Sequence, residues 1–326
     1  MNIDIHAHAY PKSLLSLLKP PLYPYFEPKQ GGGYYFRQDK GKFLSFGDSI
    51  FDPEIRISEM DAAGIDKQVI SIPAPGVERM TSSNRDARKR ARQINEGFAE
   101  LVSGHGGRFL AFASLPMQDI EASIEEMDCA LDTLKLNGVM LHSNINGRYL
   151  DSEIFLPVFE RASKLRSPVF IHPTAPPSTE GMREFALVGT LGYVYDSSTN
   201  LARMIFSGLL EKFRELKIIV PHLGGTLPYL VERLDTQPKF DPASEKRLSM
   251  KPRKYLEQVY FDTASSSPEA LELCVKLFGA DRLLLGTDYP IYPQEYVLDN
   301  IKRSKIPDET KKQIFGNAER ILINTI

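Results

Sequence analysis

The chain has 326 residues, with 40 Lys and Arg against 42 Asp and Glu, a net charge of −2, and 42% hydrophobic residues. This balance is typical of a globular protein with a large core, and it argues against a nucleic-acid-binding face or a disordered acidic chain. The two cysteines, Cys129 and Cys274, are too few for a disulfide framework, and no run approaches the ~18 apolar residues of a membrane span. We therefore expect a cytoplasmic protein that binds neither nucleic acid nor membranes.

Short apolar runs alternate with longer amphipathic segments along the chain. The runs are nearly continuous in apolar character, as in parallel strands that are covered on both faces. They are Ile3–His6, Gln68–Ile72, Phe109–Ala113, Val139–His142, Val169–His172, Ile218–Val220, Val259–Asp262 and Leu283–Leu285. Eight strands that alternate with helices predict a (β/α)8 barrel, with an open doubly wound sheet as the alternative. The open sheet usually has a glycine-rich loop after its first strand, where this chain has His6-Ala7-His8.

The intervening segments have apolar residues at the three- and four-residue spacing of amphipathic helices. These predicted helices are Ile55–Ala63, Asn84–Ser103, Ile120–Leu136, Ile154–Leu165, Leu201–Phe213 and Glu269–Leu277, followed by a C-terminal helix from about Asp308 to Leu322.

Residues 19–53 interrupt this alternation, because five prolines and a run of glycines exclude a single helix there. Strand-forming residues at Tyr34–Phe36 and Phe43–Phe46 predict a small β-rich insertion or lid after the first strand. Otherwise we expect one barrel domain over residues 1–326, with a loop at Thr174–Glu180 after the fifth strand.

Five polar residues lie at the carboxyl ends of predicted strands, where barrel enzymes place their catalytic groups. His6 and His8 are two residues apart in an extended segment, so their imidazoles project from the same face. His172, His222 and Asp288 each end or closely follow a later strand. Imidazoles at such a spacing suit a transition metal such as zinc.

This order of residues resembles the amidohydrolase superfamily. The segments IDIHAH (3–8), FDPEIRISEMDAAGI (51–65), FASLPMQD (112–119), IHPT (171–174), PHLGG (221–225), LGTDYP (285–290) and GNAERIL (316–322) carry the resemblance. Together they are similar to its decarboxylase branch, typified by 2-amino-3-carboxymuconate-6-semialdehyde decarboxylase, over nearly the whole chain.

The resemblance implies that His6, His8, His172 and Asp288 bind one divalent metal ion, usually zinc, with manganese or cobalt as alternatives. His222 would then be an acid/base that is not a ligand, and Asp288 would share in catalysis. Three imidazoles and one carboxylate leave an open coordination position, which is typical of a catalytic zinc site. The fourth strand ends in His142-Ser143 without a bridging Lys or Glu, so we expect a mononuclear site.

Each of three further polar residues has two possible roles. His142 ends the fourth strand and is expected either to contact the substrate or to be structural. His105 in Ser-Gly-His-Gly-Gly is expected to cap a helix or lie on the surface. Asp4 is expected either to orient an imidazole ligand or to be a polar residue of the core.

In the resembling branch, two arginines bind substrate carboxylates, one from the insertion and one from a neighbouring subunit. Arg233 corresponds to the second, which implies a homodimer, whereas a salt bridge is its structural alternative. The first arginine is missing, and only Arg37 or Lys42 is near its position.

These observations predict a metal-dependent, non-oxidative decarboxylase of a small aromatic, heterocyclic or muconate-type carboxylic acid. The alternatives are a hydrolase of a lactone, ester or amide, or a hydratase, at the same metal site.

Overall fold

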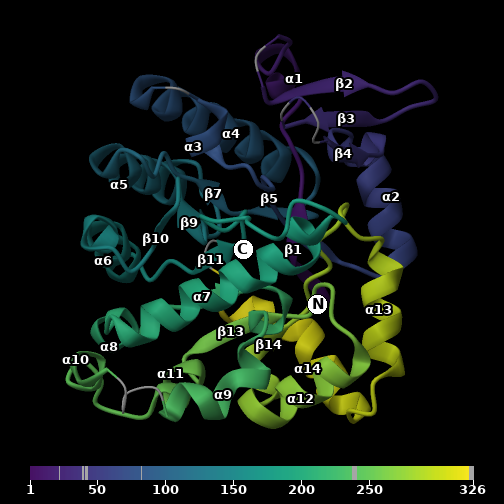
Figure 1. Cartoon of the computed structure of the whole chain (residues 1–326). Coiled ribbons are helices and arrows are strands. Elements are labelled where there is room, and N and C mark those ends of the chain that lie inside the picture. Colours follow the sequence, from purple (N-terminus) through teal and green to yellow (C-terminus); the bar gives the residue numbers. More distant parts are fainter. Residues whose placement is uncertain (22, 39, 41–42, 82, 237–240, 323–326) are drawn as a thin grey trace.

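The computed structural model describes the chain except for residues 22, 39, 41–42, 82, 237–240 and 323–326 (Figure 1). In this part of the chain, eight parallel strands form a barrel with helices around its outside, as the sequence predicts. The barrel strands are β1 (Ile3–His8), β5 (Lys67–Ser71), β6 and its continuation β7 (Phe109–Ala111 and Ala113–Ser114), β8 (Val139–His142), β11 (Val169–His172), β12 (Ile218–Val220), β13 (Val259–Asp262) and β14 (Leu283–Leu284).

The barrel is closed between β14 and β1. Ile5 N–H donates to the carbonyl of Leu285 at 2.8 Å, and Asp288 N–H donates to the carbonyl of His6 at 2.8 Å. Ala7 pairs with Tyr289 in a parallel bridge. Because the closing bonds reach as far as Asp288, this residue is held directly beside His6 and His8. The open-sheet alternative is therefore excluded.

The outer helices follow the predicted order, with several differences in their bounds. They are α1 (Ser13–Leu17), α2 (Pro53–Ala63), α3 (Val77–Met80), α4 (Asn84–Gly104), α5 (Ile120–Asp128), α6 (Leu156–Lys164), α7 (Tyr193–Phe206), α8 (Leu209–Lys212), α9 (Leu227–Thr236), α10 (Pro242–Glu245), α11 (Pro252–Leu256), α12 (Pro268–Phe278), α13 (Gln294–Arg303) and α14 (Asp308–Gly316). Side-chain caps begin several of them: Asp52 accepts from the first turn of α2, and Ser83 from that of α4. In the described residues, no helix is long and apolar enough to cross a membrane.

Three predicted helices differ by more than two residues from those of the structure. The segment predicted as Leu201–Phe213 begins eight residues earlier and is split into α7 and α8 by Gly208, whose φ of 81° breaks the helix. The segment predicted as Ile120–Leu136 is α-helical only to Asp128 and continues as a π-helical turn, Cys129–Thr133. The segment predicted as helical from about Asp308 to Leu322 is α-helical only to Gly316 and continues as a 3-10 helix, Asn317–Arg320. Helices α9 and α13 were not predicted, nor were the short helices α1, α3, α10 and α11.

The segment between β1 and α2 forms a three-stranded antiparallel sheet, β2 (Tyr25–Pro28), β3 (Tyr34–Arg37) and β4 (Phe43–Phe46), at the edge of the barrel (Figure 1). The prediction of strands in this segment is confirmed. An aromatic cluster anchors the sheet: Phe36 is fully buried and its ring stacks on Phe26 with centroids 4.6 Å apart. Gln38, just after β3, donates to the carbonyl of Ala74 at 3.1 Å, which ties this sheet to the loop after β5.

Candidate metal centre

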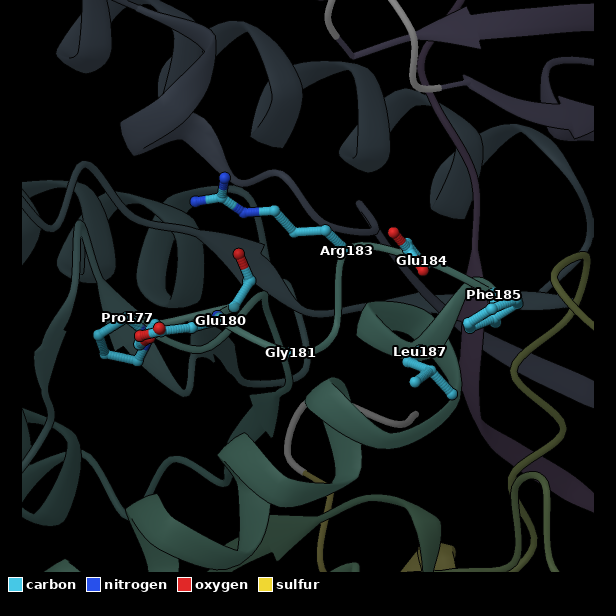
Figure 2. A pocket seen from close by; sticks show the side chains of 9 residues that line it. Pro177, Glu180, Gly181, Arg183, Glu184, Phe185 and Leu187 are labelled. Atoms are coloured by element: carbon cyan, nitrogen blue, oxygen red, sulfur yellow. The ribbon is translucent and has the colours of Figure 1, made fainter.

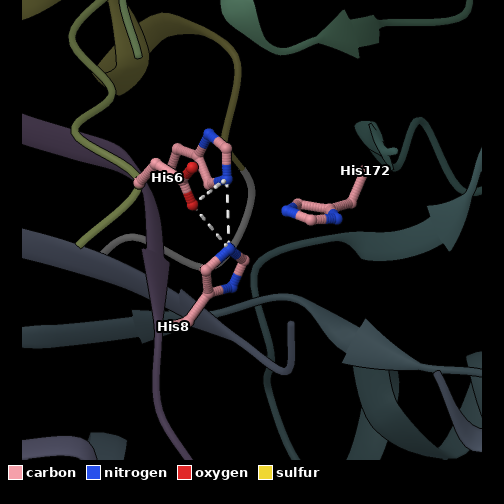
Figure 3. Close-up of side chains that lie close together, drawn as sticks. His6, His8 and His172 are labelled. Atoms are coloured by element: carbon pink, nitrogen blue, oxygen red, sulfur yellow. Dashed lines mark hydrogen bonds and ion pairs between the residues drawn. The ribbon is translucent and has the colours of Figure 1, made fainter. Parts of the chain in front are cut away.

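The four predicted metal ligands come together at the carboxyl end of the barrel. Their ligand atoms all lie within 4.8 Å of one another, and all four residues are buried. His6 Nε2 is 3.2 Å from His8 Nε2, and Oδ1 of Asp288 is 3.3 and 3.1 Å from these two nitrogens. Figure 3 shows the rings of His6 and His8 close together, with the ring of His172 facing them from β11.

The other ring nitrogen of each histidine has a partner that fixes the orientation of the ring. His6 Nδ1 is 2.8 Å from Asp262 Oδ2, His172 Nδ1 is 2.8 Å from the carbonyl of Pro173, and His8 Nδ1 is 3.3 Å from Ser71 Oγ. An Nδ1 that donates a proton leaves the lone pair of the neutral imidazole on Nε2. All three histidines therefore direct a ligating nitrogen at the same point.

This donor set fits one divalent cation. Two imidazole nitrogens 3.2 Å apart need a proton or a metal ion between them, and His172 Nε2 and Asp288 Oδ1 are buried without a hydrogen-bond partner. Bonds of 2.0–2.1 Å in a tetrahedral zinc site place neighbouring ligand atoms about 3.3 Å apart. The separations among His6, His8 and Asp288, 3.1 to 3.3 Å, match that spacing, and the ligand atom of His172 lies within 4.8 Å of the other three.

The protonation of two of the three histidines also favours a cation. Burial lowers the pKa of His8 to about 4 and that of His172 well below its ordinary value, which keeps both imidazoles neutral and able to bind a metal. Burial opposes charge on His6 and Asp288 as well, but attraction between the oppositely charged groups outweighs it. Asp262 and Asp288 raise the pKa of His6 to about 10, and His6 in turn holds that of Asp288 well below its usual range. Metal binding at His6 therefore requires the loss of a proton.

His222 lies beside these ligands but outside the group of four. Its Nε2 is 3.4 Å from Asp288 Oδ2, and its Nδ1 is buried without a partner. The backbone at His222 has a φ of 56°, a strained value for a residue other than glycine, and its N–H donates to Asp262 Oδ1 at 2.9 Å. One carboxylate, Asp262, thus orients both a metal ligand and His222.

The role of Asp262 was not anticipated from the sequence, although the residue ends β13 at the same edge of the barrel as the ligands. Asp4, considered as the residue that orients an imidazole, does not do so. Its carboxylate accepts from the backbone N–H of His6, from Gln68 Nε2, and from both the N–H and the hydroxyl of Thr287. Asp4 is therefore a polar residue of the core that stabilises the closure of the barrel.

His142 lies next to the metal centre. It pairs with His172 across β8 and β11, and the two ring centroids are 5.9 Å apart. Its Nδ1 is 3.2 Å from Oε1 of Glu78, and both side chains are 4% exposed. Burial alone would raise the pKa of Glu78, but His142 and a backbone N–H lower it, so this carboxylate is ionised. Glu78, in the short helix α3, was not anticipated either.

The remaining candidates lie away from the ligands. His105 Nδ1 is 2.8 Å from the carbonyl of Leu101 at the end of α4, which confirms its predicted capping role. Arg37 pairs with Glu27 at 2.7 Å, and Lys42 lies outside the described residues. Arg233 is exposed on α9, and the ion pairs found among the described residues do not include it, so the salt-bridge alternative has no support.

Two cavities lie along the loop that follows β11. One, of about 610 Å³, is bounded by the sheet of β2–β4, the loop after β5, and α7; its lining includes Ala74, Arg79, Thr174, Arg183 and Tyr193. The other, of about 680 Å³, is formed by residues 177–187 of the loop itself, and Figure 2 shows its lining side chains. Arg79 and Arg183 are the charged residues among the described lining of the first cavity.

Comparison with known proteins places this geometry in a family. The amidohydrolase family matches residues 3–322, and the chain belongs to that family. The chain is 30% identical to 2-amino-3-carboxymuconate-6-semialdehyde decarboxylase from Dictyostelium discoideum, over 97% of this chain and 89% of that protein. It is also 30% identical to gamma-resorcylate decarboxylase from Polaromonas sp., over 82% of this chain and 86% of that protein.

Solved structures of decarboxylases are also similar to this chain. The crystal structure of 5-carboxyvanillate decarboxylase from Sphingomonas paucimobilis matches with a TM-score of 0.84 and 26% identity, over 98% of each chain. That of a dihydroxybenzoic acid decarboxylase from Polaromonas sp., with bound manganese and the inhibitor 2-nitroresorcinol, matches with a TM-score of 0.80 and 26% identity, over 98% of this chain and 97% of the other. The predicted decarboxylase branch of the amidohydrolases is thereby confirmed.

Proposed function

We propose that the protein releases CO2 without oxidation from a small aromatic, heterocyclic or muconate-type carboxylic acid. The observation that carries this proposal is the convergence of His6, His8, His172 and Asp288 around one point, with His222 beside it. The relatives and solved structures compared above are named decarboxylases, and this supports a carboxy-lyase over a lactone, ester or amide hydrolase or a hydratase.

One divalent ion would be held by the three Nε2 atoms and the carboxylate of Asp288. When bound, it supplies a Lewis acid that polarises the substrate next to the scissile carboxylate. The three imidazoles favour zinc, whereas the Polaromonas relative carries manganese, and an N3O donor set accepts zinc, manganese or cobalt. Metal analysis of the purified protein, followed by reconstitution with each ion, distinguishes them.

His222 would supply the proton that replaces CO2. Its Nε2 is 3.4 Å from Asp288 Oδ2, which would place it near a substrate carbon at the metal centre. The electron pair of the broken C–C bond remains on that carbon, and the proton from Nε2 forms the new C–H bond as CO2 leaves. Asp262 contributes by holding the backbone of His222 in its strained conformation.

The cavity of about 610 Å³ is the proposed entrance for the substrate. Thr174, which lines this cavity, lies two residues after the proposed ligand His172, and this supports an approach to the metal centre from the cavity. Arg79 and Arg183 supply positive charge for an incoming carboxylate, a role for which the insertion offers no free arginine because Arg37 is paired with Glu27. His142 is proposed to contact the bound substrate.

The protein is further proposed to act as a cytoplasmic homodimer. On α9, Arg233 is exposed beside Tyr229, whose side chain is 86% exposed, and such an aromatic–arginine pair is typical of interface residues. The thiols of Cys129 and Cys274 are free, which fits a reducing compartment. Sedimentation that finds only monomer at working concentration would contradict the dimer.

The activity is tested on the metal-loaded protein with ortho-hydroxybenzoates, pyrimidine carboxylates and carboxymuconates, by measuring released CO2. We expect turnover of at least one of these acids and its loss after chelation. Turnover confined to lactones, esters or amides would contradict the proposed decarboxylation.

A further inference from the structure

The segment FDPEIRISEMDAAGI (51–65), which carries part of the family resemblance, supplies none of the proposed metal ligands. It forms helix α2 with its cap, and on that helix lies Arg56, a side chain with only 2% exposure. Burial lowers the pKa of Arg56 to about 10, so the guanidinium is still protonated at neutral pH. Its three hydrogen bonds go to uncharged oxygen atoms. Arg56 is therefore a buried cation that is bonded to neutral groups.

The guanidinium of Arg56 joins three elements at the carboxyl end of β1. Its Nε donates to the carbonyl of Ser49 at 3.0 Å, its Nη1 to Oε1 of Gln68 on β5 at 3.1 Å, and its Nη2 to the carbonyl of His8 at 2.6 Å. These donors point in fixed directions because the guanidinium is planar and rigid, which a lysine ammonium is not. The main chain of the proposed ligand His8 is thus held by a side chain from outside the barrel.

The same guanidinium contacts the residue that follows Asp288. Its Cζ lies over the ring of Tyr289, 4.9 Å from the centroid. The hydroxyl of Tyr289 donates to Glu59, one turn after Arg56 on α2, and its carbonyl accepts from the N–H of His8 at 2.6 Å. Helix α2 therefore holds the Tyr289 ring at both its face and its hydroxyl, directly beside Asp288.

A second path from Arg56 reaches Asp288 from the other side. Gln68, whose Oε1 accepts from Arg56, donates from Nε2 to Oδ2 of Asp4 at 3.0 Å. Asp4 in turn accepts from the N–H of Thr287 at 3.0 Å and from its hydroxyl at 2.7 Å. Arg56 is thereby linked to the residues on both sides of Asp288, as well as to His8.

Stability alone does not account for a charge at this position. Buried ionic groups can often be replaced by apolar side chains of similar volume with no loss of stability. What the guanidinium adds is a set of directed contacts to the two chain segments that carry His8 and Asp288. Nε2 of His8 and Oδ1 of Asp288 are 3.1 Å apart, a spacing that suits two ligands of one zinc ion.

We propose that Arg56 is a positioning residue of the metal centre, and that its contacts with the His8 carbonyl and the Tyr289 ring set the spacing between His8 and Asp288. This inference rests on the proposed metal centre and adds to it a residue that does not itself bind the ion. It also gives the α2 segment of the resemblance a role in the site.

The test measures metal binding rather than turnover. Competition with a chelator of known affinity gives the affinity for Zn²⁺, and the visible absorption of bound Co²⁺ reports the number and arrangement of its ligands. We expect Arg56→Met to lower the Zn²⁺ affinity about tenfold, at the lower end of the effect of groups that orient metal ligands, and to change the Co²⁺ spectrum. Arg56→Lys keeps the charge and one donor, and should recover part of the affinity.

Arg108→Met is the matched control. Arg108 also ties loops together from a side chain, because it donates to the carbonyls of Asp66 and Ile65 at 2.8 and 3.0 Å. These residues precede β5, at the end of the barrel opposite the metal centre. Arg108→Met should therefore lower the free energy of unfolding, measured with urea, while the Zn²⁺ affinity and the Co²⁺ spectrum stay at their wild-type values.

The outcomes distinguish this inference from the proposed metal centre. Wild-type Zn²⁺ affinity and an unchanged Co²⁺ spectrum in the Arg56 variants would overturn the inference even if the protein binds metal and decarboxylates. An equal loss of affinity in Arg108→Met would also overturn it, since the effect would then follow from a general loosening of the barrel. If Arg56→Met does not fold, Arg56→Lys decides alone. Wild type that binds no divalent ion would overturn both the metal centre and the role of Arg56.

Discussion

The metal centre and the cavity beside it are built from different kinds of structure. His6, His8 and His172 lie on barrel strands, Asp288 follows one, and all four are at most 5% exposed. The cavity is lined instead by the β2–β4 sheet, the loop after β5 and the long loop after β11, where Arg79 and Arg183 are exposed. Ladder hydrogen bonds hold the first region in place, whereas the second depends on the packing of loops. This difference supports the proposed division of roles, in which the strand ends carry out the reaction and the loops select the substrate.

The largest effect is expected from removing one of the proposed ligands of the metal centre. His172→Ala deletes one of the three imidazoles and leaves Asp288 and the others with too few donors for tight binding. We expect loss of bound metal and of measurable CO2 release, checked by elemental analysis of the purified variant. The matched control is His105→Ala, which should retain a full equivalent of metal. Wild-type metal content in His172→Ala would show that His172 is not a ligand.

His222→Ala should separate metal binding from proton transfer. The four ligand atoms are untouched, so the metal content should equal that of wild type, while the rate falls by about 10² to 10⁴, the usual contribution of a positioned acid or base. The measurements are elemental analysis and the rate of CO2 release. If the variant also loses its metal, His222 is a ligand and the proposed division of roles is wrong.

Asp262→Asn should have a smaller effect, because Asp262 would act on a bound ion only through His6. An amide can still accept the N–H of His222 but no longer carries the charge that fixes the tautomer of His6. Loss of such a partner typically costs about 10- to 100-fold in metal affinity or activity. Competition with a chelator of known affinity measures the change, and affinity equal to wild type would count against the role of Asp262.

The difference between the barrel strands and the surrounding loops also explains which features could be predicted from the sequence. Four of the barrel strands, β8, β11, β12 and β13, have the predicted bounds, because buried parallel strands are continuous apolar runs. The proposed ligands were found because polar residues stand out at the ends of such runs. Asp262 also lies at the carboxyl end of a strand, but its partner His6 is 256 residues away in the sequence. Nothing in the sequence around Asp262 indicates that these two side chains interact.

Outside the barrel, tertiary contacts override local preferences. The part of α7 that was not predicted, residues 193–200, contains Asp196, Ser198 and Asn200, which are residue types that favour turns. In the structure these side chains are buried and bond to other elements; Asp196 accepts from Asn144 at 2.9 Å, and Asn200 accepts from the N–H of Leu150 at 3.2 Å. Glu78 was missed for a related reason, since a four-residue helix has no periodic pattern to detect.

The smallest expected effect comes from the loop region. Arg79→Met removes one of the two guanidinium groups lining the cavity while keeping much of the apolar side chain. Because Arg79 is exposed, its attraction for a substrate carboxylate is screened, and we expect KM to rise only about fivefold with kcat nearly unchanged. High salt screens this attraction and should therefore reduce the difference in KM between the variant and wild type.

Arg88→Met is the control for Arg79→Met. Arg88 lies on α4 in an ion pair with Asp119 and does not line this cavity. The KM of the Arg88→Met variant should therefore stay at the wild-type value. A fall in kcat for Arg79→Met at constant KM would place Arg79 at the reacting atoms, and the loop would then take part in the chemistry. A rise in KM alone would support separate roles for the two regions. The loop would then attract the acid, and the residues at the strand ends would carry out the reaction.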